Sequence, residues 1–404
     1  MRTLIRGVRL FDGERTLPHT DVLIVDDLIA EPDGGPADVV IDGAGRTLLP
    51  GLIDAHTHVS DGMLAQALTF GVTTELDMFC LPGNLARQRR LAAERDDVAD
   101  LRSAGVLATA PSGHPSQIMA AESEAPAWLG DAVGPFDTIG DAGRAKEFVE
   151  ARLAEGIDYL KIVIDDGRTA GLDLPVLGPD VVAALVEAGH AAGLRTIAHV
   201  ATARDTVIAL EAGIDGLAHV FHHSEPGDPP VEDLAARIAA HGVFVITTLT
   251  YIETIAQDPA GVELVRDERI AARLSERDRA AIDRDHSAVP VHPDGVAHAR
   301  RATAALHEAG VVLLAGTDAN FFAPVHGAAM HRELLMLTQS GLSPEAALAA
   351  ATSAPARAFG LADRGRVAPG LRADLLLVDG DPTSDITATR AVAEVWRRGV
   401  RRPR

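Results

Sequence analysis

Hydrophobic and polar positions alternate in two styles along the chain. Through its middle, short apolar runs alternate with stretches rich in Ala, Leu, Glu and Arg, such as residues 180–192 and 344–352. This alternation is typical of α/β proteins, in which parallel strands are joined by crossover helices. Eight apolar runs are expected to form strands, at residues 52–55, 72–76, 105–109, 159–164, 195–198, 216–218, 243–247 and 312–315. Eight parallel strands with helices between them predict a closed (β/α)₈ TIM barrel.

Both ends of the chain have a different pattern. Residues 3–10, 21–29 and 39–41 have the composition of short strands, and residues 373–378 and 393–397 repeat that style near the other end. Either group alone has too few strands for a stable sheet. We therefore expect residues 1–50 and 365–404 to pair into one small β-sandwich-like domain, attached to a barrel of residues 51–364.

Residues 251–301 form a long, densely charged segment, as in the runs 266–269 and 276–279. Such charge runs favour a pair of solvated helices, which is the structure expected here. A lid over the barrel mouth is the alternative that stays open.

Composition limits the class of protein. The 404 residues are 47% hydrophobic, which is typical of a soluble globular protein. No apolar run is long enough to span a bilayer, and residues 1–12 lack the apolar stretch of a signal peptide, so a cytoplasmic location is expected. A net charge of −21 argues against nucleic acid and anionic membranes as partners. The basic residues near the C-terminus are expected to form a solvated tail: Arg397, Arg398, Arg401, Arg402 and Arg404.

The cysteine count restricts the metal chemistry. Cys80 is the only cysteine, which excludes an internal disulfide and zinc sites built from paired thiolates. Any metal must therefore be bound by histidines and carboxylates.

Candidate ligands follow the predicted strands. His56 and His58 come directly after the first strand and, separated by one residue, point to the same side. About 0.6 such His-x-His matches are expected by chance in this chain, so the pair needs context. Four more side chains lie in or at the end of an apolar strand, where barrel enzymes assemble their sites: Lys161, His199, His219 and Asp318. We expect all six to meet at one mouth.

The order His-x-His, Lys, His, His, Asp over strands one, four, five, six and eight resembles the amidohydrolase superfamily. Further matches lie at residues 49–56 (LPGLIDAH), 71–74 (GVTT), 316–319 (GTDA) and 370–375 (GLRADL). A His after strand three and a His-Gly after strand eight are similar to the imidazolonepropionase-related branch, which includes prolidase-like dipeptidases.

The resemblance implies two divalent metal ions and a division of their ligands. His56, His58 and Asp318 would hold one ion, and His199 and His219 the other. Lys161, carboxylated by carbon dioxide to a carbamylated lysine, would bridge them, and its apolar neighbours favour the neutral amine that this modification needs. Zinc is the expected metal, although such ligands also suit manganese, cobalt or iron.

The implied activity is hydrolysis of an amide-type C–N bond in a dipeptide, N-acyl or cyclic amide substrate. A hydroxide between two metals roughly 3.5 to 4 Å apart is the expected nucleophile. Asp318 would be the catalytic residue that takes a proton from the attacking water and delivers it to the leaving nitrogen.

Three residues are candidate substrate contacts. His114 ends a turn that resembles a substrate-binding turn of the family, with Ser112 and Pro115 at glycine positions, which changes the loop's shape. His222 either lines the pocket or lies exposed in its loop. Tyr251 either donates to a substrate oxygen or packs. Separately, carboxylates at the end of strand two, Glu75 and Asp77, either recognise a cationic group or support the ligands by hydrogen bonds.

Other functions stay open. The same site would serve a lactonase or phosphotriesterase. A mononuclear deaminase on this scaffold usually has a Glu near the strand-five His, whereas His199 is followed by Val-Ala-Thr. A non-catalytic scaffold would have lost ligands, and all six are present. The expected partner is a small-molecule substrate, and similar enzymes commonly form homo-oligomers.

Overall fold

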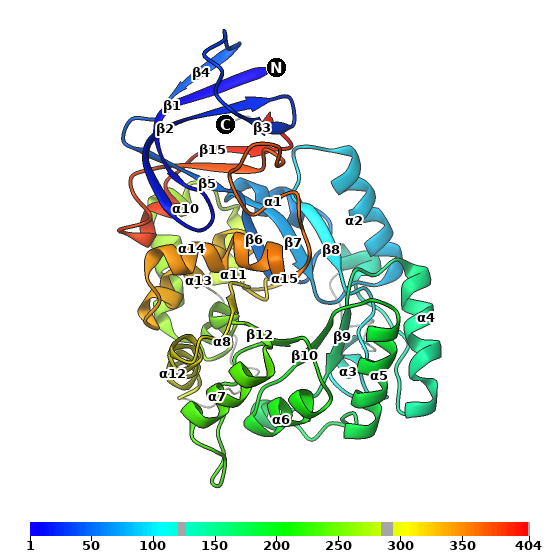
Figure 1. Ribbon diagram of the computed structural model, residues 1–404. Helices are drawn as coiled ribbons and strands as arrows, with labels where there is room; N and C mark the ends of the chain where they lie inside the picture. The colour runs from blue at the N-terminus through cyan, green and yellow to red at the C-terminus, as the bar shows by residue number, and fades with distance from the viewer. Residues whose placement is uncertain (120–126, 284–293, 403–404) are drawn as a thin grey trace.

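Eight parallel strands form the centre of the molecule (Figure 1). The computed structural model describes residues 1–119, 127–283 and 294–402. One sheet has three parallel strands and a second has five, in the order β6-β7-β8 and β13-β12-β11-β10-β9. Their bounds are β6 (Leu52–Thr57), β7 (Val72–Asp77), β8 (Asp100–Ser103), β9 (Leu160–Val163), β10 (Thr196–His199), β11 (Gly216–Ala218), β12 (Phe244–Ile246) and β13 (Leu313–Leu314).

Backbone contacts connect the two sheets at both junctions. A parallel bridge joins Thr57 to Ala319, and another joins Ala108 to Ile162. These junctions are single bridges, so within the described residues the ladder is not continuous around a ring. The domain is therefore a TIM-barrel-like α/β domain.

The position predicted for the third strand is wrong. Strand β8 covers Asp100–Ser103, and residues 105–109 make only the Ala108 bridge. Gly105 has a φ of +60°, which ends the extended conformation just after β8. The apolar run 105–109 is buried like a strand, but the more polar segment before it makes the hydrogen bonds of the ladder.

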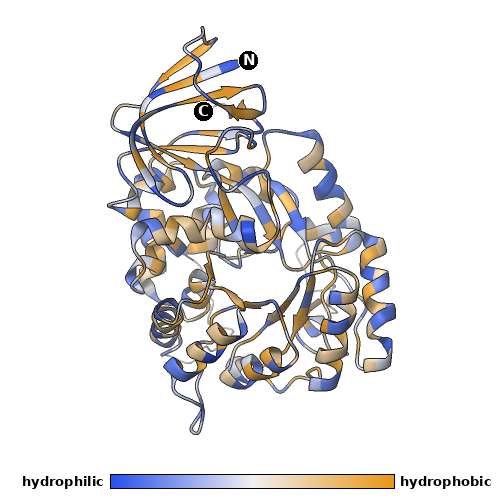
Figure 2. Ribbon diagram, viewed as in Figure 1, coloured by the Kyte–Doolittle hydropathy of each residue, from blue (hydrophilic) through white to orange (hydrophobic). Residues whose placement is uncertain are grey.

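Helices surround the parallel strands, and Figure 2 shows mainly hydrophobic strands among helices that carry both hydrophilic and hydrophobic residues. The helices expected at residues 180–192 and 344–352 are confirmed. The surrounding helices are α1 (Met63–Thr69), α2 (Pro82–Glu94), α3 (Ser116–Met119), α4 (Ala145–Glu155), α5 (Pro179–Ala191), α6 (Ala203–Glu211), α7 (Val231–His241), α12 (Gly295–Glu308), α13 (Ala328–Gln339), α14 (Pro344–Ala350) and α15 (Ser353–Ala358). Among the described residues, no helix is long and apolar enough to cross a bilayer.

The segment 251–301 is not a pair of solvated helices. It contains most of α8 (Leu249–Ile255), then α9 (Glu263–Arg266), α10 (Glu268–Ala271), α11 (Glu276–Ile282) and the start of α12. Apolar residues spaced among the charges, including Leu264, Ile270 and Leu274, pack into one cluster with Phe70. Residues 284–293 lie outside the described residues, and the lid stays a prediction.

Strands from both chain ends share one sheet. Its strands are β1 (Arg2–Phe11), β2 (Thr16–Val25), β3 (Leu28–Ala30), β4 (Val39–Asp42), β5 (Arg46–Pro50), β14 (Leu375–Asp379), β15 (Val392–Arg397) and β16 (Val400–Arg401). The two ends meet where β5 pairs antiparallel with β14, from Pro50 opposite Leu375 to Arg46 opposite Asp379. The strand expected at residues 21–29 is divided by a turn at Asp26, whose φ is +53°. The division at residues 50/51 and 364/365 stays a prediction.

A buried carboxylate joins β8 to the C-terminal part of the chain. Asp100 pairs with Arg364, with Arg372 at 3.0 Å and with Arg397 at 3.3 Å. Burial alone would raise the pKa of Asp100, but the three guanidinium groups outweigh it and hold that pKa well below its usual range. The solvated tail expected from the sequence is therefore wrong at Arg397, which is 1% exposed. Arg404 lies outside the described residues.

We expect Asp100→Asn to lower the free energy of unfolding by about 3–5 kcal/mol at neutral pH, because three guanidinium groups lose their shared counter-charge. A carboxylate whose pKa is lower in the folded state contributes stability above its unfolded pKa and loses it as the pH falls. The difference between wild type and variant should therefore shrink below about pH 4. Urea denaturation at pH 7 and pH 3 measures both effects.

Asp363→Asn is the matched control. Asp363 pairs with the same Arg364 and Arg372, but its side chain is 50% exposed. Its loss should cost no more than about 1 kcal/mol. Equal destabilisation by the two substitutions would contradict the role given to Asp100.

Candidate metal centre

Five of the six predicted ligands lie near or just after the carboxyl ends of the parallel strands, and Lys161 lies two residues before the end of β9. His56 is in β6 and His58 follows it, while Lys161 is in β9. The remaining three stand at the end of β10, after β11 and after β13: His199, His219 and Asp318. Parallel strands end at a common edge, so one register brings together side chains from distant parts of the sequence.

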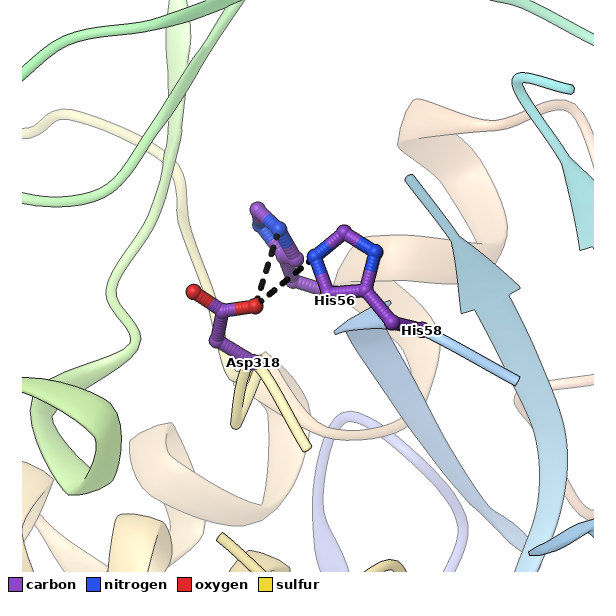
Figure 3. Close-up of side chains that lie close together, drawn as sticks. All are labelled: His56, His58 and Asp318. Atoms are coloured by element: carbon purple, nitrogen blue, oxygen red, sulfur yellow. Dashed lines mark ion pairs between the residues drawn. The ribbon is translucent and has the colours of Figure 1, made fainter. Parts of the chain in front are cut away.

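Figure 3 shows His56 and His58 pointing toward the carboxylate of Asp318. Oδ1 of Asp318 lies 3.0 Å from Nε2 of His58 and 3.4 Å from Nε2 of His56. One donor atom from each residue lies within 4.8 Å of the others, so the three can reach one ion. Burial and the charge of Lys161 lower the pKa of His56 well below its usual value. Burial also acts to lower the pKa of His58, but Asp318 outweighs it and raises that pKa.

His199 and His219 form a second pair beside the first. Nδ1 of His199 lies 2.9 Å from Nε2 of His219, and the ring centroids of His219 and His56 are 4.8 Å apart. Burial, followed by the neighbouring His199 and Lys161, lowers the pKa of His219 well below its usual value. A neutral imidazole is the form that binds metals.

Lys161 is the group whose environment is hardest to explain without a ligand. Its side chain is 2% exposed, and its Nζ has no hydrogen-bond partner in the described part of the chain. Burial lowers the pKa of Lys161 to about 7, against an opposing effect of Asp318. Nδ1 of His56 is also buried and lacks a partner among the described residues. Orphaned buried nitrogens beside histidines and a carboxylate fit a site for divalent metals.

Backbone strain gathers at this site. His219, Thr248 and Asp318 have φ values of +75°, +49° and +54°. Such values are uncommon outside glycine, and a β-branched Thr there is an outlier, so the surrounding structure must hold it in place. Glu333 contributes by accepting from the backbone N–H groups of Leu249, at 3.0 Å, and Thr250, at 2.8 Å, just after Thr248.

Asp54 connects the two segments that carry the first ligand group. Its carboxylate accepts from the backbone N–H of His56 at 3.2 Å and of Thr317 at 3.0 Å. It also accepts from the hydroxyl of Thr317 at 2.6 Å. Asp54 therefore fixes the strand bearing His56 relative to the turn bearing Asp318.

Two of the three predicted substrate contacts lie beside the ligands. The ring of His114 is 5.4 Å from that of His199, and the ring of Tyr251 is 6.4 Å from that of His219. Burial lowers the pKa of His114 to about 4, so its ring is neutral at pH 7. His222 lines a cavity of about 380 Å³ together with Arg301, and burial, with a smaller effect of His199, lowers the pKa of His222 to about 4. The roles of all three in substrate binding stay predictions.

The two carboxylates near the end of β7, Glu75 and Asp77, support their surroundings by hydrogen bonds, one of the two alternatives. Glu75 is 2.9 Å from Nδ1 of His326, and both side chains are buried. Asp77 accepts from the backbone N–H of Val59 at 3.0 Å and from the hydroxyl of Ser103 at 2.5 Å. Burial raises the pKa of Asp77 to about 6. These contacts fix the segment that follows His58.

Sequence reasoning missed Asp165. Its Oδ2 lies 3.2 Å from Nε2 of His199, and it forms a second group of close donor atoms with His114 and His199. The signal was present, because Asp165 comes directly after the strand expected at residues 159–164. The neighbouring Asp166 has almost the same place in the sequence, so position alone does not distinguish the two.

One family model matches most of the chain. The model of the amidohydrolase family matches residues 47–401. The chain belongs to this family. An imidazolonepropionase from Paracoccus denitrificans is 28% identical over 388 residues, covering 86% of this chain and 82% of the relative. An uncharacterized protein from Mycobacterium tuberculosis is 28% identical over 405 residues, covering 95% and 92%.

Solved structures agree in fold. A Xaa-Pro dipeptidase with bound methionine aligns with a TM-score of 0.76 at 19% identity, over 100% of both chains. A molinate hydrolase aligns with a TM-score of 0.75 at 22% identity, over 99% of this chain and 94% of the other. The resemblance to the amidohydrolase superfamily is therefore confirmed, whereas the imidazolonepropionase-related and prolidase-like branch stays a prediction.

For this amidohydrolase we expect Asp54→Ala to weaken the binding of divalent metal by about 10–100-fold, because the segments bearing His56 and Asp318 lose their shared hydrogen bonds. Equilibrium dialysis against a chelator, followed by plasma mass spectrometry, measures this change. Asp42→Ala is the control, since Asp42 is exposed and accepts from the backbone of Ala44. An unchanged affinity in Asp54→Ala would contradict the role given to Asp54.

Proposed function

We propose that this chain is a binuclear metal-dependent hydrolase that cleaves an amide-type C–N bond in a small-molecule substrate. Two divalent ions, zinc by expectation, would be held by His56, His58, Lys161, His199, His219 and Asp318. The observation that carries the proposal is the amine of Lys161, which is buried and has no hydrogen-bond partner among the described residues. Its charge acts on both His56 and His219, one from each group of candidate ligands.

The relatives support this class of reaction. Imidazolonepropionase, Xaa-Pro dipeptidase and molinate hydrolase are the named activities of similar proteins. Membership of the amidohydrolase family supports hydrolysis of carbon–nitrogen bonds. Substrates of the proposed enzyme are therefore peptides, N-acyl compounds or cyclic amides.

Lys161 needs a chemical change before it serves as a ligand, because a protonated amine has no lone pair. Its burial favours the neutral amine, which adds to the carbon of carbon dioxide. A C–N bond forms, one proton leaves, and the product is an anionic carbamate with oxygen donors.

The chain's own residues supply orientation and proton transfer. Bound metal ions would supply Lewis acidity, which polarises a carbonyl and lowers the pKa of water. Asp318 would take a proton on a carboxylate oxygen and deliver it to the leaving nitrogen. His114 and Tyr251, with rings near His199 and His219, would contact the substrate.

We expect close to two metals per wild-type chain by plasma mass spectrometry, and a clear fall in Lys161→Ala because the bridging donor is lost. The chain has only one other lysine, Lys146, which lies exposed on α4. Protein equilibrated with ¹³C-labelled bicarbonate should therefore give a carbamate carbon signal by NMR that is lost in Lys161→Ala.

Lys146→Ala is the control and should keep both the metals and the carbamate signal. One metal per chain, unchanged in Lys161→Ala and without a carbamate signal, would overturn the lysine-bridged pair and favour a mononuclear deaminase. Rates on matched amide, lactone and phosphotriester panels decide the bond that is cleaved. Faster turnover of lactones or phosphotriesters would refute the preference for amides.

A further inference from the structure

Two residues outside the set of six candidate ligands contact the second histidine pair, His199 and His219. Asp165 contacts Nε2 of His199 at 3.2 Å, and the hydroxyl of Thr248 contacts Nδ1 of His219 at 2.8 Å. The nitrogens left over, Nδ1 of His199 and Nε2 of His219, face each other at 2.9 Å. Each imidazole thus has one nitrogen on a supporting residue and one aimed at its neighbour.

From these contacts we propose that Asp165 and Thr248 are positioning residues for a metal ion bound between the two facing nitrogens. Asp165 selects the tautomer of His199, and Thr248 holds the ring of His219 in either tautomer. This inference rests on the proposed binuclear site. It assigns a role to two residues outside the set of six ligands.

Asp165 determines which ring nitrogen of His199 carries the hydrogen. An ionised carboxylate only accepts hydrogen bonds, so Nε2 of His199 must carry the hydrogen. A neutral imidazole has a single N–H, and Nδ1 therefore presents a lone pair. Asp165 is itself held in place, because its other oxygen accepts from the backbone N–H of Gly167 at 2.8 Å.

Thr248 allows His219 to change tautomer. Without an ion, the 2.9 Å contact requires one hydrogen between the facing nitrogens, and it must belong to Nε2 of His219. Thr248 then donates to Nδ1. Binding of an ion would require Nε2 to release its hydrogen to solvent and Nδ1 to take one up from solvent, and the Thr248 hydroxyl would then turn and accept. A hydroxyl both donates and accepts, which suits it to both states.

The geometry of Asp165 makes a sharp substitution available. In Asp165→Asn the oxygen stays with the N–H of Gly167, so the amide NH₂ faces Nε2 of His199 and donates to it. His199 must then carry its hydrogen on Nδ1, which points at the ion site. The substitution therefore changes the tautomer with little change in side-chain shape.

The test uses full-length protein stripped of metal and titrated with Co²⁺, followed by visible absorption and plasma mass spectrometry. Asp165→Asn and Thr248→Val should weaken the binding of one of the two Co²⁺ ions by about 10–100-fold and leave the affinity for the other unchanged. Thr248→Ser keeps the hydroxyl and should restore wild-type affinity. Asp166→Asn and Thr254→Val are matched controls, because these side chains bond to the backbone of Arg168 and Thr250.

A second readout is independent of metal. Nitrogen-15 NMR of histidine-labelled, metal-free protein reports the tautomer of His199, whose signals are assigned by their loss in His199→Gln. We expect an Nε2–H tautomer in the wild type and an Nδ1–H tautomer in Asp165→Asn. An unchanged tautomer would overturn the role of Asp165, even if the wild type binds a single ion and the binuclear proposal fails.

His114→Ala separates positioning from direct ligation. His114, Asp165 and His199 are close enough to hold an ion themselves. In that case His114→Ala would weaken the same Co²⁺ ion as Asp165→Asn, and our inference would be wrong. We expect the affinity of His114→Ala for both ions to match the wild type. Equal weakening of both ions by Asp165→Asn would also overturn it, because the effect would then be general.

Discussion

Burial of nitrogen donors at the carboxyl ends of the parallel strands is the constraint on which the site depends. Taking a charged group out of water is costly, so the interior favours neutral forms of imidazoles and amines. It lowers the pKa of His56 and His219 well below the usual value and that of Lys161 to about 7. The neutral form carries the lone pair with which an imidazole binds a metal and with which, in the proposed site, the amine of Lys161 would add to carbon dioxide. The burial that costs stability therefore also prepares the ligands.

This arrangement needs a rigid frame, because orphaned nitrogens and left-handed backbone conformations both cost free energy. The frame consists of carboxylates that accept from backbone N–H groups beside the ligands. Asp54 holds the segments of His56 and Asp318, and Glu333 holds the turn after Thr248. Hydrogen bonds of these buried carboxylates offset the strain that they maintain.

Much of the fold could be predicted from the sequence, because apolar runs and crossover helices have distinct periods. Seven of the eight strand positions follow the apolar pattern, whereas β8 does not. Its residues Asp100 and Arg102 are polar, and partners far along the chain, such as Arg364, compensate the buried charge. The burial of helices α9–α11 was not predicted for the opposite reason, since single apolar residues such as Ile270 stand among many charges.

The six candidate ligands could be predicted because each stands in a strand or near its end and the family order connects them. Asp165 could not be predicted, because the feature that distinguishes it is its contact with His199. That residue lies 34 positions further along the chain, and no local sequence pattern encodes such a contact. Thr248 is similar, since a threonine after a strand gives no sign of its φ of +49° or of the ring it contacts. Position along the strands predicts ligands, whereas the groups that orient them depend on tertiary contacts.

Lysine and arginine occupy different kinds of buried position in this chain. Thirty-seven basic residues include only two lysines, Lys146 and Lys161, so 35 are arginines. Buried cations that pair with carboxylates, such as Arg364 with Asp100 and Arg332 with Glu253, need a group that keeps its charge away from water. Guanidinium does so, whereas an amine gives up its proton when buried. Lysine at position 161 therefore supplies what arginine cannot, a neutral nitrogen in the interior of the site.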